Sequence, residues 1–121
     1  MENGSEYSQV RQWARVQLEL RVKISYSRHN VLQSTHGRSH DIGEGGFSIY
    51  VPCELIEGEH VELEFTLPAS RTPIRARATV RNREGFRYGI EFVTLTKAQR
   101  DDIARLSKAY PALTRNTGAA S

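Results

Sequence analysis

Strict alternation of apolar and polar residues marks five segments of the chain. A period of two is typical of half-buried β-strands, because successive side chains of a strand point to opposite faces. The predicted strands are residues 16–26, 47–51, 61–67, 74–80 and 86–92. Residues 33–41 are polar and form a weaker sixth candidate. Turn residues separate these segments at 29–30, 43–46, 68–73 and 82–85.

The pattern changes after the last predicted strand. Thr96 to Gln99 has the sequence of a capping box, in which each side chain can satisfy the backbone N–H of the other residue. Leu95, Ile103, Leu106 and Tyr110 then lie along one side of a predicted helix, which we expect to end at Pro111.

Short strands joined by tight turns predict an all-β fold, either an antiparallel barrel or a sandwich, with a C-terminal α-helix over an open end or face. We favour a barrel of about six strands. Barrel closure would also hide the strand edges that otherwise invite aggregation. We predict a flexible N-terminal arm over residues 1–10, one barrel-and-helix domain over 11–110, and a frayed tail over 111–121.

Composition agrees with one folded domain, since 121 residues carry 38% hydrophobic and 26% charged residues. No apolar stretch is long enough to span a membrane, and the N-terminus lacks the apolar core of a signal peptide. The single cysteine, Cys53, cannot form an internal disulfide. These observations predict a cytoplasmic protein.

The net charge of +3 permits an anionic partner without requiring one. Three of the 17 basic residues are lysines and the rest are arginines, which bind phosphate and guanine edges with two parallel hydrogen bonds. Five arginines lie along the last two predicted strands and the turn between them, namely Arg75, Arg77, Arg81, Arg83 and Arg87. In the expected register Arg77 lies opposite both Glu64 and Glu91, while Arg81 and Arg87 stay unpaired. A solvated face is the favoured interpretation.

Two segments carry candidate chemistry. Arg11 and Arg15 lie four residues apart just before the first strand, and Asp41-Ile42-Gly43-Glu44-Gly45-Gly46 precedes another. Their order resembles the signature of the PilZ domain, a bacterial receptor for cyclic di-GMP, which has an RxxxR segment followed by (D/N)xSxxG. The run Tyr88 to Phe92 also resembles the end of a PilZ barrel. The resemblance covers roughly residues 11–110.

The resemblance implies a non-enzymatic receptor or adaptor with no cofactor. Arg11 and Arg15 would clamp phosphate and guanine, and Asp41 would contact guanine or hold an arginine. Gly43, Gly45 and Gly46 would shape the floor of the site. Binding would order the N-terminal arm and alter a surface for a protein partner. The chain departs from the PilZ pattern at two positions. Val10 stands where strong binders often have arginine, and Gly43 stands in place of serine. We therefore predict that binding is retained but weakened.

Other interpretations remain open. The domain could be a degenerate PilZ-like interaction module that binds no nucleotide, or a small barrel that binds single-stranded nucleic acid through its arginine face. Trp13 could stack on guanine or pack the arm against the barrel. His36 and His40 lie about 13 Å apart in an extended segment, so we predict no metal site. No local catalytic signature is present.

Overall fold

The structure is a computed structural model that describes residues 15–110. The predicted arm and tail, and with them Arg11 and Trp13, lie outside the described residues. The strands are β1 (Arg15–Gln17), β2 (Arg21–Arg28), β3 (Val31–Gly43), β4 (Gly46–Tyr50), β5 (His60–Phe65), β6 (Ile74–Glu84) and β7 (Arg87–Phe92). They are followed by helix α2 (Lys97–Ala104) and the 3-10 turn η1 (Arg105–Lys108).

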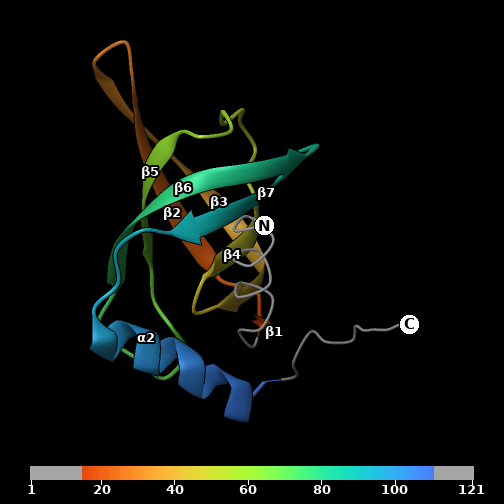
Figure 1. Cartoon of the computed structure of the whole chain (residues 1–121), viewed down its shortest axis with the longest axis vertical. Helices are drawn as coiled ribbons and strands as arrows, with labels where there is room; N and C mark the ends of the chain where they lie inside the picture. Colours follow the sequence, from red (N-terminus) through yellow and green to blue (C-terminus); the bar gives the residue numbers. More distant parts are fainter. Residues whose placement is uncertain (1–14, 111–121) are drawn as a thin grey trace, which may run out of the picture.

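Six antiparallel strands close into a barrel. The order β3-β2-β5-β6-β7-β4 returns to its start because β4 also pairs with β3, and β1 adds a short extra strand on β3 (Figure 1). The closed barrel and the C-terminal helix confirm the predicted fold class. The 13-residue strand β3 is the element that joins the two ends of the sheet.

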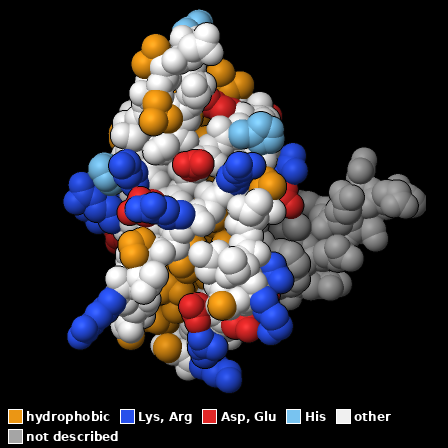
Figure 2. Space-filling model, turned by 90° about the vertical axis from the view of Figure 1, so that its left-hand side faces the viewer, with side chains coloured by type: hydrophobic (Ala, Val, Ile, Leu, Met, Phe, Trp, Pro, Cys, Tyr) orange, Lys and Arg blue, Asp and Glu red, His pale blue; other side chains and the backbone are white. Residues whose placement is uncertain are grey.

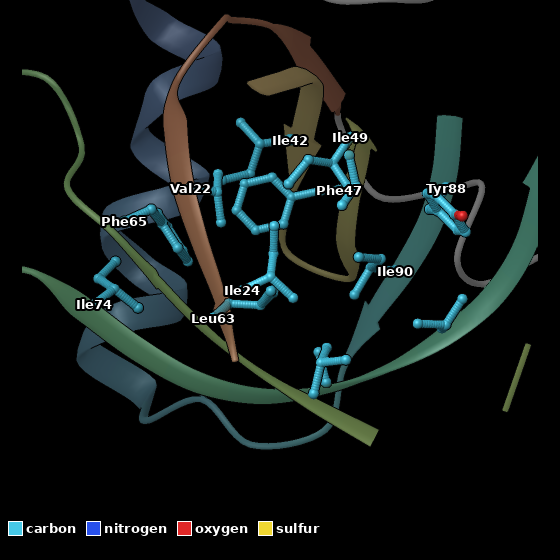
Figure 3. Packing of buried hydrophobic residues seen from close by; sticks show 14 of the residues in the cluster. Val22, Ile24, Ile42, Phe47, Ile49, Leu63, Phe65, Ile74, Tyr88 and Ile90 are labelled. Atoms are coloured by element: carbon cyan, nitrogen blue, oxygen red, sulfur yellow. The ribbon is translucent and has the colours of Figure 1, made fainter. Parts of the chain in front are cut away.

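The barrel interior is filled by the alternate apolar residues of every strand. Figure 3 shows Phe47 of β4 at the centre, with Val22 and Ile24 of β2 and Ile42 of β3 around it. Phe47 meets Phe65 edge-on, with 4.7 Å between the ring centroids. Such pairs add to the stabilisation from burial, which is about 25 cal/mol for each Å² of apolar surface.

The first alternating segment forms two strands, although the pattern predicted one strand over residues 16–26. The chain breaks at Leu18–Leu20, because β1 pairs with residues 41–43 of β3 while β2 pairs with residues 31–38. Ser39 bridges the break: its hydroxyl donates to Leu18 O at 2.6 Å and accepts from Leu20 N at 2.8 Å. Ser39 is buried, so these bonds satisfy polar groups that water cannot reach.

Two strands run longer than the pattern predicted. The weak candidate at residues 33–41 lies within β3. The first residues of β3 extend beyond the barrel and cover no core, so their side chains do not alternate between apolar and polar. Strand β6 continues through Glu84 and pairs with β7, so the predicted turn at 82–85 shrinks to Gly85–Phe86. Phe86 is therefore exposed at a turn rather than buried in a strand.

The predicted register of the arginine-bearing hairpin was wrong by two residues. Arg75, not Arg77, lies opposite Glu64, and Arg77 lies opposite Glu62. Glu91 lies opposite Thr79 and forms an ion pair with Arg81, which the prediction left unpaired. The turn before Ile74 is longer than expected, because Phe65 rather than Leu67 pairs with Ile74. The β6–β7 turn is shorter than expected, and a β-bulge near Arg81 adds to the shift of β7. Figure 2 shows basic and acidic side chains mixed across one face of the molecule.

Helix α2 lies across one end of the barrel (Figure 1). Thr96 forms the predicted capping box with Gln99, and Ile103 and Leu106 join the core. The α-helix ends at Ala104, earlier than Pro111, and continues as the 3-10 turn η1. Neither helical segment in the described part of the chain has the length and hydropathy needed to cross a bilayer.

Tyr88 provides a test of the core. Its buried hydroxyl accepts from Leu55 N at 3.0 Å and donates to Cys53 O at 3.1 Å. We expect Tyr88→Phe to lower the free energy of unfolding by about 1–3 kcal/mol, because a buried N–H loses its partner. The matched control is Tyr26→Phe, because within residues 15–110 the hydroxyl of Tyr26 hydrogen-bonds only to the Cys53 sulfur, at 3.6 Å. Equal losses in urea denaturation of the two variants would contradict this account.

Candidate functional site

The candidate site centres on an ion pair between β1 and β3. Arg15 lies directly opposite Gly43, which carries no side chain, so the guanidinium reaches diagonally to Asp41. Arg15 Nε donates to Asp41 Oδ1 at 2.7 Å, and Nη2 donates to the same oxygen. The Asp41 side chain is 5% exposed and that of Arg15 is 27% exposed. The carboxylate is therefore a buried anchor, while the guanidinium still reaches solvent.

Two further groups surround the other oxygen of Asp41. His40 Nδ1 lies 3.0 Å from Oδ2, and Arg87 Nη2 of β7 lies 4.0 Å from it. Arg87 Nε also donates to Ser48 Oγ at 2.8 Å. A β-bulge at residues 39–41 of β3 aims His40 toward Asp41. One carboxylate thus faces two guanidinium groups and an imidazole, which leaves an excess of positive charge.

Small residues lie between these groups on the outer face of β3, β4 and β7. Gly43 pairs with Gly46, and Asp41 pairs with Ser48, which in turn pairs with Gly89. We call Gly43, Gly46, Ser48 and Gly89 the glycine floor. Strand alternation places them on the same face, because Ile42, Phe47 and Ile90 point into the barrel. Gly45 belongs to the adjoining turn, where its carbonyl accepts from Phe92 N at 2.9 Å.

Gly46 is required by the packing of the strands. A Cβ atom on Gly46 would lie 1.9 Å from the carbonyl oxygen of Ile90 on β7. The obstacle is backbone, so it cannot move aside as a flexible side chain would. This glycine therefore allows β4 to approach β7 and helps to close the barrel beside the site.

The structure brings Arg15, Asp41, Gly43, Gly45 and Gly46 together, as the two motifs suggested. Sequence reasoning missed His40, Ser48, Arg87 and Gly89. Arg87 was placed on a solvated face without a partner, but it lies beside Asp41 because β7 pairs with β4. One signal was available: Gly89 interrupts an alternating strand, which indicates a close approach or a surface without side chains.

The arrangement is suited to holding an anion. Arginine groups fixed by a buried carboxylate are oriented before a ligand arrives, and charge-assisted hydrogen bonds to phosphate are the strong kind. Within the glycine floor, Gly43 and Gly46 are buried, Ser48 and Gly89 are partly exposed, and the Asn82 side chain lies against Gly89. Among residues 15–110, no three histidine, cysteine or acidic side chains cluster as metal ligands.

Comparison with protein families finds one match, to the PilZ domain, over residues 9–109. A comparison with curated proteins finds no matching relative.

Three solved structures share the fold at low sequence identity. The inhibitor of motility MotI/DgrA of Bacillus subtilis has 18% identity and a TM-score of 0.65, covering 81% of this chain and 49% of that protein. The chain thus spans about half of its length. The PilZ domain of YcgR from Escherichia coli with c-di-GMP has 14% identity and a TM-score of 0.61, and the match covers 82% of this chain and 89% of that one. The PilZ domain of CeSA from a cellulose-synthesizing bacterium has 15% identity and a TM-score of 0.57, and the match covers 78% of this chain and 95% of that one.

Gly46 allows a test of the strand contact beside the site. We expect Gly46→Ala to lower the free energy of unfolding by about 3 kcal/mol or more, because the methyl group would overlap the Ile90 carbonyl. Gly85→Ala is the control: Gly85 has φ +65°, and among the described residues no atom beyond its two chain neighbours lies within 4 Å of its Cβ position, so only backbone strain of about 1–2 kcal/mol applies. Chemical denaturation measures both, and equal losses would contradict the close approach.

Proposed function

The chain belongs to the PilZ domain family, and we propose that it is a receptor or adaptor that binds cyclic di-GMP without enzymatic activity. The observation that carries the proposal is the Arg15–Asp41 ion pair beside the glycine floor. It places an arginine of the first motif on the aspartate of the second, although 26 residues separate them in sequence. A ligand with two phosphates and two guanines suits the excess positive charge of the two guanidinium groups.

Each site residue has a proposed role. Arg11 and Arg15 clamp phosphate and guanine, and Asp41 holds Arg15 in place rather than contacting the base itself. Gly43, Gly45 and Gly46 shape the floor. Arg87 adds a second cation from the opposite side of Asp41. This division of roles follows from burial, because Asp41 is 5% exposed while Arg87 is 40% exposed.

Gly43 in place of serine weakens the proposed binding. A lost hydrogen bond to a charged group costs about 1.5–3 kcal/mol, or roughly ten- to a hundredfold in affinity. We propose that Arg87 offsets part of this loss by contacting the ligand itself, because its guanidinium lies 4.0 Å from Asp41 Oδ2 and is 40% exposed.

The proposed signal is an ordering of the N-terminal arm on the ligand, followed by contact with a protein partner. Arg15 is the first described residue of β1 and is held by the barrel. Because Arg15 is held at the site, we propose that contact of the ligand with Arg11 orders the arm against the barrel.

The first test is a titration with cyclic di-GMP by calorimetry. We expect Arg11→Ala and Arg15→Ala each to weaken binding at least about tenfold, because each removes a charge-assisted contact. Arg75→Ala is the matched control, since Arg75 is exposed on the outer face of β6 and pairs with Glu64. Arg11→Ala leaves the Arg15–Asp41 pair intact, and thermal unfolding of each variant confirms that the barrel persists.

The wild-type titration also separates the remaining alternatives. No heat at high micromolar ligand would overturn the proposal and favour a degenerate interaction module. GMP and a short oligonucleotide serve as control ligands. A nucleic-acid-binding barrel would instead be favoured if the oligonucleotide bound with a steep salt dependence and Arg15→Ala left its affinity unchanged.

The arm is tested by the fluorescence of Trp13, the only tryptophan. We expect saturating cyclic di-GMP to change its emission and to protect residues 1–15 from hydrogen exchange and proteolysis, because ligand contact orders the segment. The control is Arg11→Ala at the same ligand concentration, which should show little change. Unchanged emission and protection at saturation would show that the arm does not respond.

A further inference from the structure

The β2–β3 hairpin extends beyond the barrel, drawn in orange in Figure 1. Its turn is His29–Asn30, where both residues have positive φ, as a two-residue hairpin turn requires. Strand β2 pairs with β5 only at residues 23–25, and β3 begins to pair with β4 only at Arg38. The outer part of the hairpin therefore has two edges outside the barrel ladder, and they differ in how they are covered.

The β2 edge is covered by the segment between β4 and β5. Arg28 donates from Nε and Nη2 to the carboxylate of Glu59 at 3.1 and 2.9 Å, and from Nη2 to Glu54 O at 2.8 Å. Burial raises the pKa of Glu59, but the hydrogen bonds from Arg28 and the Ile56 N–H outweigh it, so the net pKa is lowered. The carboxylate stays ionised at neutral pH, and the clamp holds the hairpin in a fixed position.

No strand within residues 15–110 covers the outer edge of β3 over residues 31–37. Ser39 N donates to Leu20 O on the β2 side. Because backbone directions alternate along a strand, the N–H and C=O groups of Leu32, Ser34 and His36 point away from β2. Residues 31–37 contain no lysine, arginine, acidic residue or proline. Natural proteins usually protect an edge strand with such residues, so this edge is open to pairing.

A groove adjoins the same edge. Its walls come from His36 and Arg38 of β3, from Tyr50 and Pro52 at the end of β4, and from Phe86 in the β6–β7 turn. Tyr50 is 48% exposed and Phe86 is 55% exposed, and Leu32 on the adjacent edge is 76% exposed. Arg21 completes the rim, and no carboxylate lines the groove.

We propose that the β3 edge and this groove form a docking site for an extended, acidic peptide segment of a partner protein. The segment would add as a strand to β3, forming backbone hydrogen bonds with Leu32, Ser34 and His36. Its alternate apolar side chains would enter the groove against Tyr50 and Phe86. A free sheet edge beside a side-chain pocket is the arrangement used in peptide recognition by strand addition.

Charge selects an acidic peptide over a second copy of this chain. The rim carries Arg21 and Arg38, and the exposed pair that Arg38 makes with Glu19 is of the weak surface kind. A second copy would bring another chain of net charge +3 to a basic rim. The docking site lies outside the nucleotide-binding residues, and the inference stands whether or not the chain binds cyclic di-GMP.

Selection of short random peptides displayed on phage, with the full chain immobilised, tests the proposal. Recovered peptides are synthesised and their affinity is measured by fluorescence anisotropy. We expect acidic sequences with apolar residues at alternate positions. Ser34→Pro should weaken their binding at least about tenfold, since it removes an outward N–H, while Ser34→Thr keeps that donor and binds normally. Phe86→Ser should weaken binding through the groove without altering the strand.

Thermal unfolding checks that Ser34→Pro stays folded, and Phe86→Ser tests the site independently if it does not. Failure to enrich any peptide on the wild type relative to Ser34→Pro would overturn the proposal, as would equal affinity for wild type, Ser34→Pro and Phe86→Ser. A wild-type dimer that Ser34→Pro converts to monomer in sedimentation would identify a second copy as the occupant and overturn the acidic partner. A cyclic di-GMP titration of the same proteins reports separately on the proposed function.

Discussion

The pairing of β3 with β4 is the constraint on which the rest of the structure depends. It closes the sheet into a barrel and encloses a core centred on Phe47. The same pairing sets Asp41 opposite Ser48 and brings Arg87 of β7 to the carboxylate. Because β3 is longer than the contact with β4, its first residues extend past the barrel as an uncovered edge. One strand thus accounts for the core, the candidate nucleotide site and the proposed docking site.

Tyr50 lies between the two proposed sites. Its ring meets that of His40 edge-on at 6.5 Å, and the Arg87 guanidinium lies 5.9 Å from its centroid. The same ring forms a wall of the groove beside β3. A ligand that moved Arg87 or His40 would therefore act on the groove through one side chain. This contact offers a physical route from the proposed nucleotide site to the proposed docking site that does not require a change of fold.

Local patterns predicted the elements well and their pairing poorly. The capping box at Thr96 and the turn at His29–Asn30 were predicted because neighbouring residues determine them. The position of Arg87 was not, because it depends on which strand lies beside β4. The break at Leu18–Leu20 was also missed, since alternation continues through it and only the contact with Ser39 shows that two strands are present. A register error of two residues leaves every side chain on the correct face, so the pattern could not detect it.

The sequence by itself determined the all-β class, most of the core residues and the two motifs, because a period of two and the motif residues are properties of the chain alone. Only the tertiary structure decided that Asp41 holds Arg15, that Arg87 joins them, and that residues 31–37 of β3 lack a strand partner within the described residues. Those features depend on closure, which brings residues far apart in sequence within hydrogen-bond distance. Alternation shows which side of a strand faces the core but not which strand lies beside it.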